Sequence, residues 1–232
     1  MVSSHGFVCQ ESHVRFGAII FDFDGVIADS EALANTVLSE EVTRLGLPTT
    51  LEDAYLRYMG RRWSEVAALI EEGLQKPLPA DFSDQVLSAT LRRFRSELKE
   101  VEGAARFIRA LGGLPKSIAS SSSPARLDLC LEVLDLSADF AGAVFSAEMV
   151  AQGKPHPDVF LLAADRMQIS PAKCLVIEDS PSGVRGAKAA GMTVVGLTAG
   201  SHIRPGHSEP LREAGADMIA PSWEAVSGLI SG

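Results

Sequence analysis

Two aspartates stand two positions apart where a short apolar segment of the chain ends. The segment Ala18 to Phe21 is followed by Asp22-Phe23-Asp24-Gly25. In an extended strand, residues two apart face the same side. Two carboxylates so placed repel each other unless a cation or a shared proton compensates. The pair therefore indicates a site that holds a cation or a proton, or else a solvated acidic turn formed at Gly25.

Three further polar clusters follow later in the chain. Ser120 to Ser123 come after an apolar segment, Lys154 lies in a Gly-Lys-Pro loop, and Glu178-Asp179 close another apolar segment. Taken singly, the serines could cap a helix, Lys154 could be a solvated loop lysine, and the acidic pair could cap the next helix. The clusters form one site only if the fold brings these positions together.

The elements that must position these residues alternate as in a parallel sheet covered by helices. The expected strands are Ala18 to Phe21, Lys116 to Ala119, Ala143 to Phe145, Leu175 to Ile177, Val194 to Leu197 and Met218 to Ala220. The expected helices between them are Gly103 to Leu111, Ala125 to Leu134, Asp158 to Met167 and Gly183 to Ala190. This pattern predicts an α/β fold with a doubly wound, Rossmann-like parallel sheet. Ligands bind such sheets outside the carboxyl ends of the strands, where all four clusters would meet, and their joint placement favours the functional interpretation.

Residues 32–100 interrupt the alternation. They read as successive amphipathic helices, Leu33 to Leu45, Ser64 to Glu72 and Asp84 to Leu98, with no strand-like segment between them. We expect a small inserted α-helical domain at 32–100, a core formed by 16–31 and 101–232, and a flexible leader at 1–15.

Composition and charge narrow the class of partner. The 232 residues carry a formal charge of −9, so no basic field is available for a nucleic acid polymer. An anionic substrate would need a cation or basic groups within its site. No apolar segment reaches the roughly 20 residues of a membrane span, and Cys9, Cys130 and Cys174 lack the spacing of a zinc site. We expect a cytoplasmic monomer that acts on a small molecule and binds no membrane.

The ordered set of clusters resembles the haloacid dehalogenase-like hydrolase superfamily, over nearly the whole chain after the leader. Asp22-Phe23-Asp24-Gly25 is similar to its first motif, Ser120 to the second, Lys154 to the third and the run from Glu178 to Gly183 to the fourth. The insert matches the helical cap of the branch that includes β-phosphoglucomutase, sugar-phosphate phosphatases and phosphoglycolate phosphatases. Asp29-Ser30-Glu31 and Tyr58-Met59-Gly60 also look like that branch.

The resemblance implies a magnesium-dependent phosphatase, acting on a sugar phosphate or a similar phosphomonoester. Asp22 would attack phosphorus and form an acyl phosphate, while Asp24 would carry the proton. Lys154, Ser120 and the N–H of Ser121 would hold the phosphoryl oxygens, although the serine register leaves open which of the two hydroxyls serves. Mg²⁺ prefers oxygen ligands, and the metal residues would be Asp22, Asp24 through its carbonyl, Asp179 and, more indirectly, Glu178.

Substrate recognition would fall to the cap and to the first motif. Gly25, Gly60, Arg61 and Arg62 are candidate substrate-binding residues, and Trp63 could stack on a sugar. A solvated helix start, with the tryptophan packed into the cap, explains the cap residues equally well.

Four alternatives remain to be compared. A dehalogenase would not need the second acid, Asp24; a phosphonatase would need a cap lysine suited to a Schiff base, and a non-catalytic binding protein would be expected to lack one of the motif residues. The runner-up is a hexose-phosphate mutase of the β-phosphoglucomutase type. The mutases of this branch have a histidine ten positions after the second aspartate, where this chain has Ala34. Its absence leaves Asp24 unguarded by an imidazole and favours hydrolysis by water.

Overall fold

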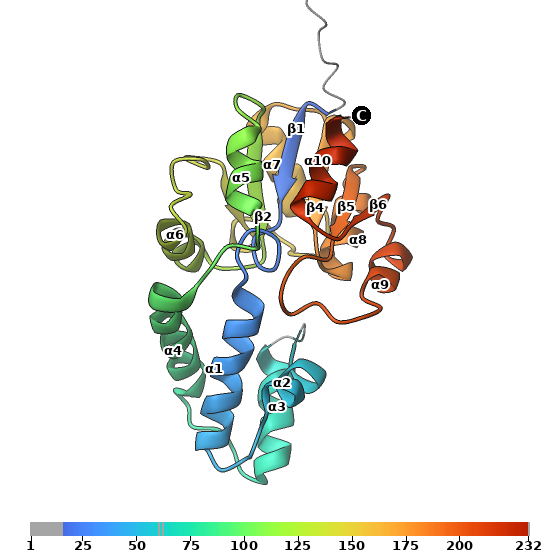
Figure 1. Ribbon diagram of the computed structural model, residues 1–232. Helices are drawn as coiled ribbons and strands as arrows, with labels where there is room; N and C mark the ends of the chain where they lie inside the picture. The colour runs from blue at the N-terminus through green and yellow to red at the C-terminus, as the bar shows by residue number, and fades with distance from the viewer. Residues whose placement is uncertain (1–15, 60, 62, 232) are drawn as a thin grey trace, which may run out of the picture.

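The sheet at the centre of the molecule has six parallel strands. The computed structural model describes residues 16–59, 61 and 63–231, so the expected leader lies outside the described residues. The strand order is β3-β2-β1-β4-β5-β6, and Figure 1 labels all of these strands except β3. The strands are β1 (Ala18–Phe21), β2 (Lys116–Ser120), β3 (Val144–Ser146), β4 (Cys174–Glu178), β5 (Thr193–Leu197) and β6 (Met218–Ala220). All five pairings are parallel, which confirms the predicted fold class.

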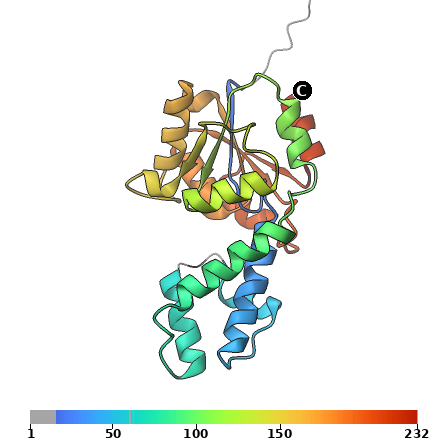
Figure 2. The ribbon, with the colours of Figure 1, turned by 90° about the vertical axis from the view of Figure 1, so that its left-hand side faces the viewer.

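Helices cover both faces of this sheet (Figure 2). Alternate residues of each strand face opposite ways: Ile19, Phe21 and Ile177 belong to one apolar cluster, whereas Ile20 and Val176 belong to the other. The first cluster includes side chains of α5 (Ala104–Ala110), α6 (Pro124–Val133) and α10 (Trp223–Ser231). The second includes side chains of α7 (Asp158–Met167), α8 (Pro181–Ala189) and α9 (Ser208–Glu213). The sheet is therefore doubly wound.

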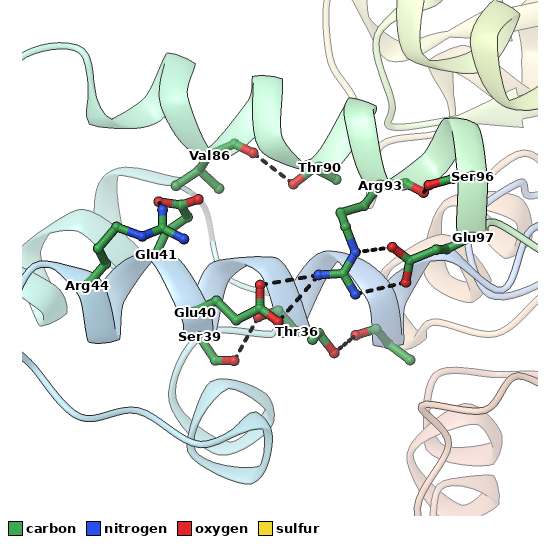
Figure 3. Close-up of polar contacts among 11 residues, drawn as sticks. Thr36, Ser39, Glu40, Glu41, Arg44, Val86, Thr90, Arg93, Ser96 and Glu97 are labelled. Carbon is green, nitrogen blue, oxygen red and sulfur yellow. Dashed lines mark hydrogen bonds and ion pairs between the residues drawn. The ribbon is translucent and has the colours of Figure 1, made fainter.

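Four helices lie apart from the sheet and carry an apolar cluster of their own (Figure 1). These cap helices are α1 (Ser30–Arg44), α2 (Leu51–Arg57), α3 (Trp63–Leu74) and α4 (Phe82–Glu97). Their cluster includes Val42, Tyr58, Ile70 and Phe82. Figure 3 shows α1 against α4, with Arg93 of α4 bonded to Glu40 of α1 at 3.2 Å and to Glu97 of its own helix. The cap helices therefore bury apolar side chains against one another, in a cluster whose described residues all lie outside the sheet.

The two chain segments that join the cap helices to the sheet are hydrogen-bonded to each other. The N–H of Asp29 donates to the carbonyl of Lys99 at 2.9 Å, and the N–H of Val101 donates to the carbonyl of Ile27 at 2.8 Å. The outgoing and returning segments thus form one paired connection beside the end of β1.

The sequence located the strands well and missed three helices. Among the missed ones, α2 begins at a capping box in which Thr50 and Asp53 bond each other's backbone N–H groups. It is only 7 residues long, and α9 is 6. Such short helices show too few apolar repeats for periodicity to reveal them.

Candidate active site

Three carboxylates meet where the winding of the sheet reverses, between β1 and β4. The N–H of Asp22 donates to the carbonyl of Ile177 at 2.9 Å, which places Asp22 beside the end of β4. Oxygens of Asp22, Glu178 and Asp179 lie within 4.8 Å of one another, and all three residues are buried. Burial raises the pKa of Asp22 well above its ordinary value, although Lys154 opposes this and the neighbouring carboxylates add to it. The solvated acidic turn that the sequence allowed is therefore wrong.

Lys154 is the buried cation of this cluster, with a side chain only 4% exposed. Its Nζ lies 2.7 Å from Asp22 Oδ1 and 2.6 Å from Glu178 Oε1, and 5.1 Å from the ring centre of Phe160 on α7. Burial alone would lower the pKa of Lys154, but the charges of Asp22 and Glu178 raise it. Lys154 is thus a charged group of the site and not a solvated loop lysine.

The negative charge that Lys154 leaves unbalanced at this cluster suits a divalent cation. Three buried carboxylates face one ammonium, so the ionised cluster keeps an excess of negative charge in a poorly solvated place. Glu178 is already engaged at both oxygens, by Lys154 at one and by the N–H and hydroxyl of Ser180 at the other, each at 2.9 Å. Asp22 and Asp179 are therefore the better direct ligands, and all donors are oxygens, as Mg²⁺ prefers.

Asp24 sits beside this cluster in a separate hydrogen-bond network. Arg126 Nη2 donates to its Oδ1 at 2.5 Å, Ser122 Oγ donates to its Oδ2 at 2.5 Å, and Ser30 also donates to it. Burial alone would raise the pKa of Asp24, but Arg126 and the hydroxyl donors lower it below its ordinary value. Asp24 is held as a carboxylate here. Its charged partner is Arg126, a residue that the sequence analysis did not single out.

Gly25 has no side chain, and Asp179 and His202 fill the space where a Cβ would lie. Its φ is +78°, a backbone conformation that glycine tolerates best. A Cβ at this position would lie 1.8 Å from Asp179 Oδ2 and 2.7 Å from Cε1 of His202. Nothing but glycine fits beside these side chains, whatever part Gly25 has in substrate binding.

The serine run links β2 to α6 and faces Asp24 through Ser122. Ser120 is buried, and its Oγ accepts a hydrogen bond from the N–H of Ser122 at 3.0 Å. Ser121 is exposed. Ser123 holds the N-cap position of α6 without a capping bond from its side chain. The sequence singled out Ser120 and Ser121 and missed that the third hydroxyl contacts Asp24.

Two histidines that the sequence analysis left without a role contact Asp179. His202 Nε2 lies 3.2 Å from Asp179 Oδ2, and His207 Nε2 donates to the carbonyl of Asp179 at 2.6 Å. Burial raises the pKa of Asp179, and the hydrogen bond from His202 opposes the rise. Burial alone would lower the pKa of His202, but its bond to Asp179 raises it.

The cap candidates are less well defined. Gly60 and Arg62 lie outside the described residues. Arg61 is exposed, and Trp63 is 39% exposed with its ring 6.1 Å from that of Phe82. Trp63 therefore packs partly into the cap and keeps one part exposed.

Comparison with known proteins identifies the family. The model of the haloacid dehalogenase-like hydrolases matches residues 16–191. The chain belongs to the haloacid dehalogenase-like hydrolases. It is 35% identical over 178 residues to a phosphorylated carbohydrates phosphatase of Thermotoga maritima, a match that covers 75% of this chain and 82% of that protein. With phosphatases among its curated relatives, the chain is an enzyme of the phosphoric monoester hydrolase class.

Solved structures of other members resemble the chain over almost its full length. A haloacid dehalogenase-like protein of Agrobacterium tumefaciens superposes with a TM-score of 0.83 at 35% identity, covering 93% of this chain and 98% of that one. A haloacid dehalogenase family hydrolase of Deinococcus radiodurans, solved with phosphate and sodium, superposes with a TM-score of 0.82 at 31% identity, covering 94% of this chain and 96% of that one.

A bifunctional riboflavin kinase/FMN phosphatase of Arabidopsis thaliana is 30% identical over 77% of this chain, but the chain spans only 48% of that protein. Within the described part of the chain, no helix combines the length and apolar character needed to cross a bilayer.

Proposed function

We propose that the protein is a Mg²⁺-dependent phosphatase that hydrolyses a small phosphorylated metabolite, a sugar phosphate or a similar phosphomonoester, through an aspartyl phosphate on Asp22. The observation that carries this proposal is the contact of Asp22 with Lys154 at 2.7 Å, inside a cluster of three buried carboxylates. A buried nucleophile, a fixed ammonium and oxygen donors for a hard cation are what a phosphate monoester needs, because its own negative oxygens repel an anionic nucleophile.

In the first step, an oxygen of Asp22 forms a bond to phosphorus and the bond from phosphorus to the ester oxygen breaks. Lys154 and the serine loop, with Ser120 and the N–H of Ser121, hold the phosphoryl oxygens. Asp24 gives its proton to the departing alcohol oxygen. Since Asp24 is held as a carboxylate by Arg126 and Ser122, we propose that it takes one proton from solvent when substrate binds, and that the proton it later takes from water returns to solvent.

In the second step, water attacks phosphorus, Asp24 takes the proton from that water, and the bond from phosphorus to Asp22 breaks to release phosphate. When bound, Mg²⁺ would neutralise negative charge on the phosphoryl group. Asp22, the carbonyl of Asp24 and Asp179 would hold the ion, with Glu178 in support. The cap, which we assign to residues 32–100, would exclude water and read the rest of the substrate, with Gly60, Arg61 and Arg62 as candidates.

The relatives support this assignment without choosing the substrate. One is named as a phosphatase of phosphorylated carbohydrates, and one structure was solved with phosphate. The direct test is phosphate release by the purified protein from a panel of sugar phosphates, phosphoglycolate and nucleoside monophosphates, with Mg²⁺ and with chelator. Release from none of them in Mg²⁺ would contradict the proposal.

A hexose-phosphate mutase shares the same residues and is the second candidate. Position 34 is alanine, and the side chain of Asn35 donates to the carbonyl of Glu31 at 2.8 Å, so neither residue stands in for an imidazole. The enzyme should be incubated with β-glucose 1-phosphate, a trace of glucose 1,6-bisphosphate and Mg²⁺, and followed by phosphorus NMR. Free phosphate fits a phosphatase, whereas glucose 6-phosphate without free phosphate identifies a mutase.

A further inference from the structure

The loop between β5 and α9, residues 198–207, contacts both the hinge of the cap and the cap itself. The N–H and hydroxyl of Ser201 donate to Asp29 Oδ1 at 3.0 and 2.9 Å, at the start of α1. Arg204 Nη2 donates to Glu52 Oε2 of α2 at 3.0 Å, and its guanidinium lies 4.6 Å from the ring centre of Tyr55. The loop is thus anchored on both sides of His202.

Between these anchors, His202 is turned inward, toward the carboxylate cluster. The residue is 5% exposed, and its Nε2 is the ring atom near Asp179 Oδ2. A carboxylate oxygen can only accept, so Nε2 carries the hydrogen, and the ring donates without needing a positive charge. Nδ1 is buried and has no hydrogen-bond partner among the described residues. Of the two ring nitrogens, it is therefore Nε2 that makes the polar contact, with Asp179.

Two glycines confine the ring. A Cβ on Gly200 would lie 2.8 Å from Cε1 and from Nδ1 of His202, and one on Gly25 would lie 2.7 Å from Cε1. The imidazole therefore packs directly on the backbone of the loop and of the first motif. A side chain so enclosed has little freedom to change rotamer, and its donor stays aimed at Asp179.

We propose that His202 is a positioning residue for the metal site: its Nε2–H holds Oδ2 of Asp179, so that Oδ1 is presented to the divalent cation. This inference rests on the proposed function, since it takes Asp179 as a ligand of that cation. Hydrogen bonds from surrounding groups to ligand side chains typically change metal affinity by about 10- to 100-fold when removed. His207, which holds the carbonyl of the same residue, fixes the backbone from which the carboxylate projects.

The test is Mn²⁺ binding to the whole purified protein, measured from the electron paramagnetic resonance signal of free Mn²⁺, which needs no substrate. His202→Phe keeps a ring and removes the donor, and should raise the Kd for Mn²⁺ by about 10- to 100-fold. His202→Gln can place an amide N–H near the position of Nε2 and should stay within a few-fold of the parent. His156→Phe, at an exposed histidine in the Lys154 loop, is the matched control and should leave the Kd unchanged.

The outcomes separate the inference from the proposed function. Unchanged Mn²⁺ affinity in His202→Phe, or a loss in His202→Gln as large as in His202→Phe, overturns the role of His202. If circular dichroism shows that His202→Phe does not fold, His202→Asn replaces it. The shorter amide of asparagine does not reach Oδ2 of Asp179, so this variant should bind Mn²⁺ as weakly as is expected of His202→Phe. A parent that binds no Mn²⁺ overturns the metal site and this inference together. If the parent binds Mn²⁺ and His202→Phe weakens that binding as expected, but the parent releases no phosphate from any ester, this inference stands and the proposed activity does not.

Discussion

Replacing Lys154 with methionine should destabilise the metal-free protein strongly. Methionine retains much of the apolar stem, but the ammonium that contacts Asp22 and Glu178 disappears. Each charge-assisted hydrogen bond contributes roughly 1.5–3 kcal/mol, so two of them give about 3–6 kcal/mol. This agrees with the ~3–5 kcal/mol found when one partner of a buried ion pair is removed. For a chain of this length, the melting temperature should fall by roughly 6–20 °C.

The assay is thermal and urea denaturation followed by circular dichroism, in chelator. Lys188→Met is the matched control, because Lys188 pairs with Asp217 at 2.8 Å but both side chains are more than a third exposed. That variant should lose only about 0–1 kcal/mol. If Lys154→Met and Lys188→Met prove equally stable, the reasoning about the buried cluster is refuted.

The deficit of Lys154→Met should also depend on pH. In the parent, Lys154 opposes the rise that burial imposes on the pKa of Asp22, so its removal raises that pKa further. A carboxyl group whose pKa is higher in the folded than in the unfolded state binds more protons when folded, and stability then increases as pH falls. The difference from the parent should be largest at neutral pH and should shrink as the pH is lowered. A deficit that grows on acidification contradicts this sign.

Three further predictions concern activity and packing. Phosphate release should require Mg²⁺, vanish in chelator and be inhibited by Ca²⁺, whose longer and looser coordination would misplace Asp22; full activity in chelator contradicts the metal assignment. Arg126→Met should lower kcat by about 100-fold, because Asp24 loses its strongest tether and small misplacements cost that much, and Arg126→Lys should recover part of it in steady-state kinetics. Trp223→Ala should lower the free energy of unfolding, measured by urea denaturation, by ~3–5 kcal/mol, because Trp223 is 1% exposed and its ring centre lies 4.7 Å from that of Phe107. Trp63→Ala, at a partly exposed tryptophan, should lower it much less.

The sequence was sufficient to locate the strands and the carboxylates at their ends. Apolar segments are short and regular in this chain, and the residue that ends each one identifies the edge of a parallel sheet. Pro124 occupies the first turn of α6, one residue before the expected start of that helix. The proximity of Asp22 to Asp179 therefore followed from topology alone.

The network around Asp24 and Asp179 could not be predicted in the same way. Arg126 and Ser122 reach Asp24 across roughly 100 positions of sequence. Which serine faces Asp24 depends on where β2 ends and the chain turns, and a run of four serines gives no local signal for that choice. His202 comes from a polar loop whose path is fixed by its contacts with Asp29 and the cap. Such contacts depend on three-dimensional packing and not on periodicity.

The most direct test of the account is the identity of the residue that becomes phosphorylated. The enzyme should be mixed with an aryl phosphate and Mg²⁺, quenched in acid within its first turnovers and analysed by peptide mass spectrometry. The account predicts phosphate on Asp22, absent from Asp22→Asn and still detectable in Asp24→Asn with a good leaving group, because the side chain of Asp24 serves as the proton carrier and not as the nucleophile. Phosphate on any other residue, or on the Asp22→Asn protein, would contradict it.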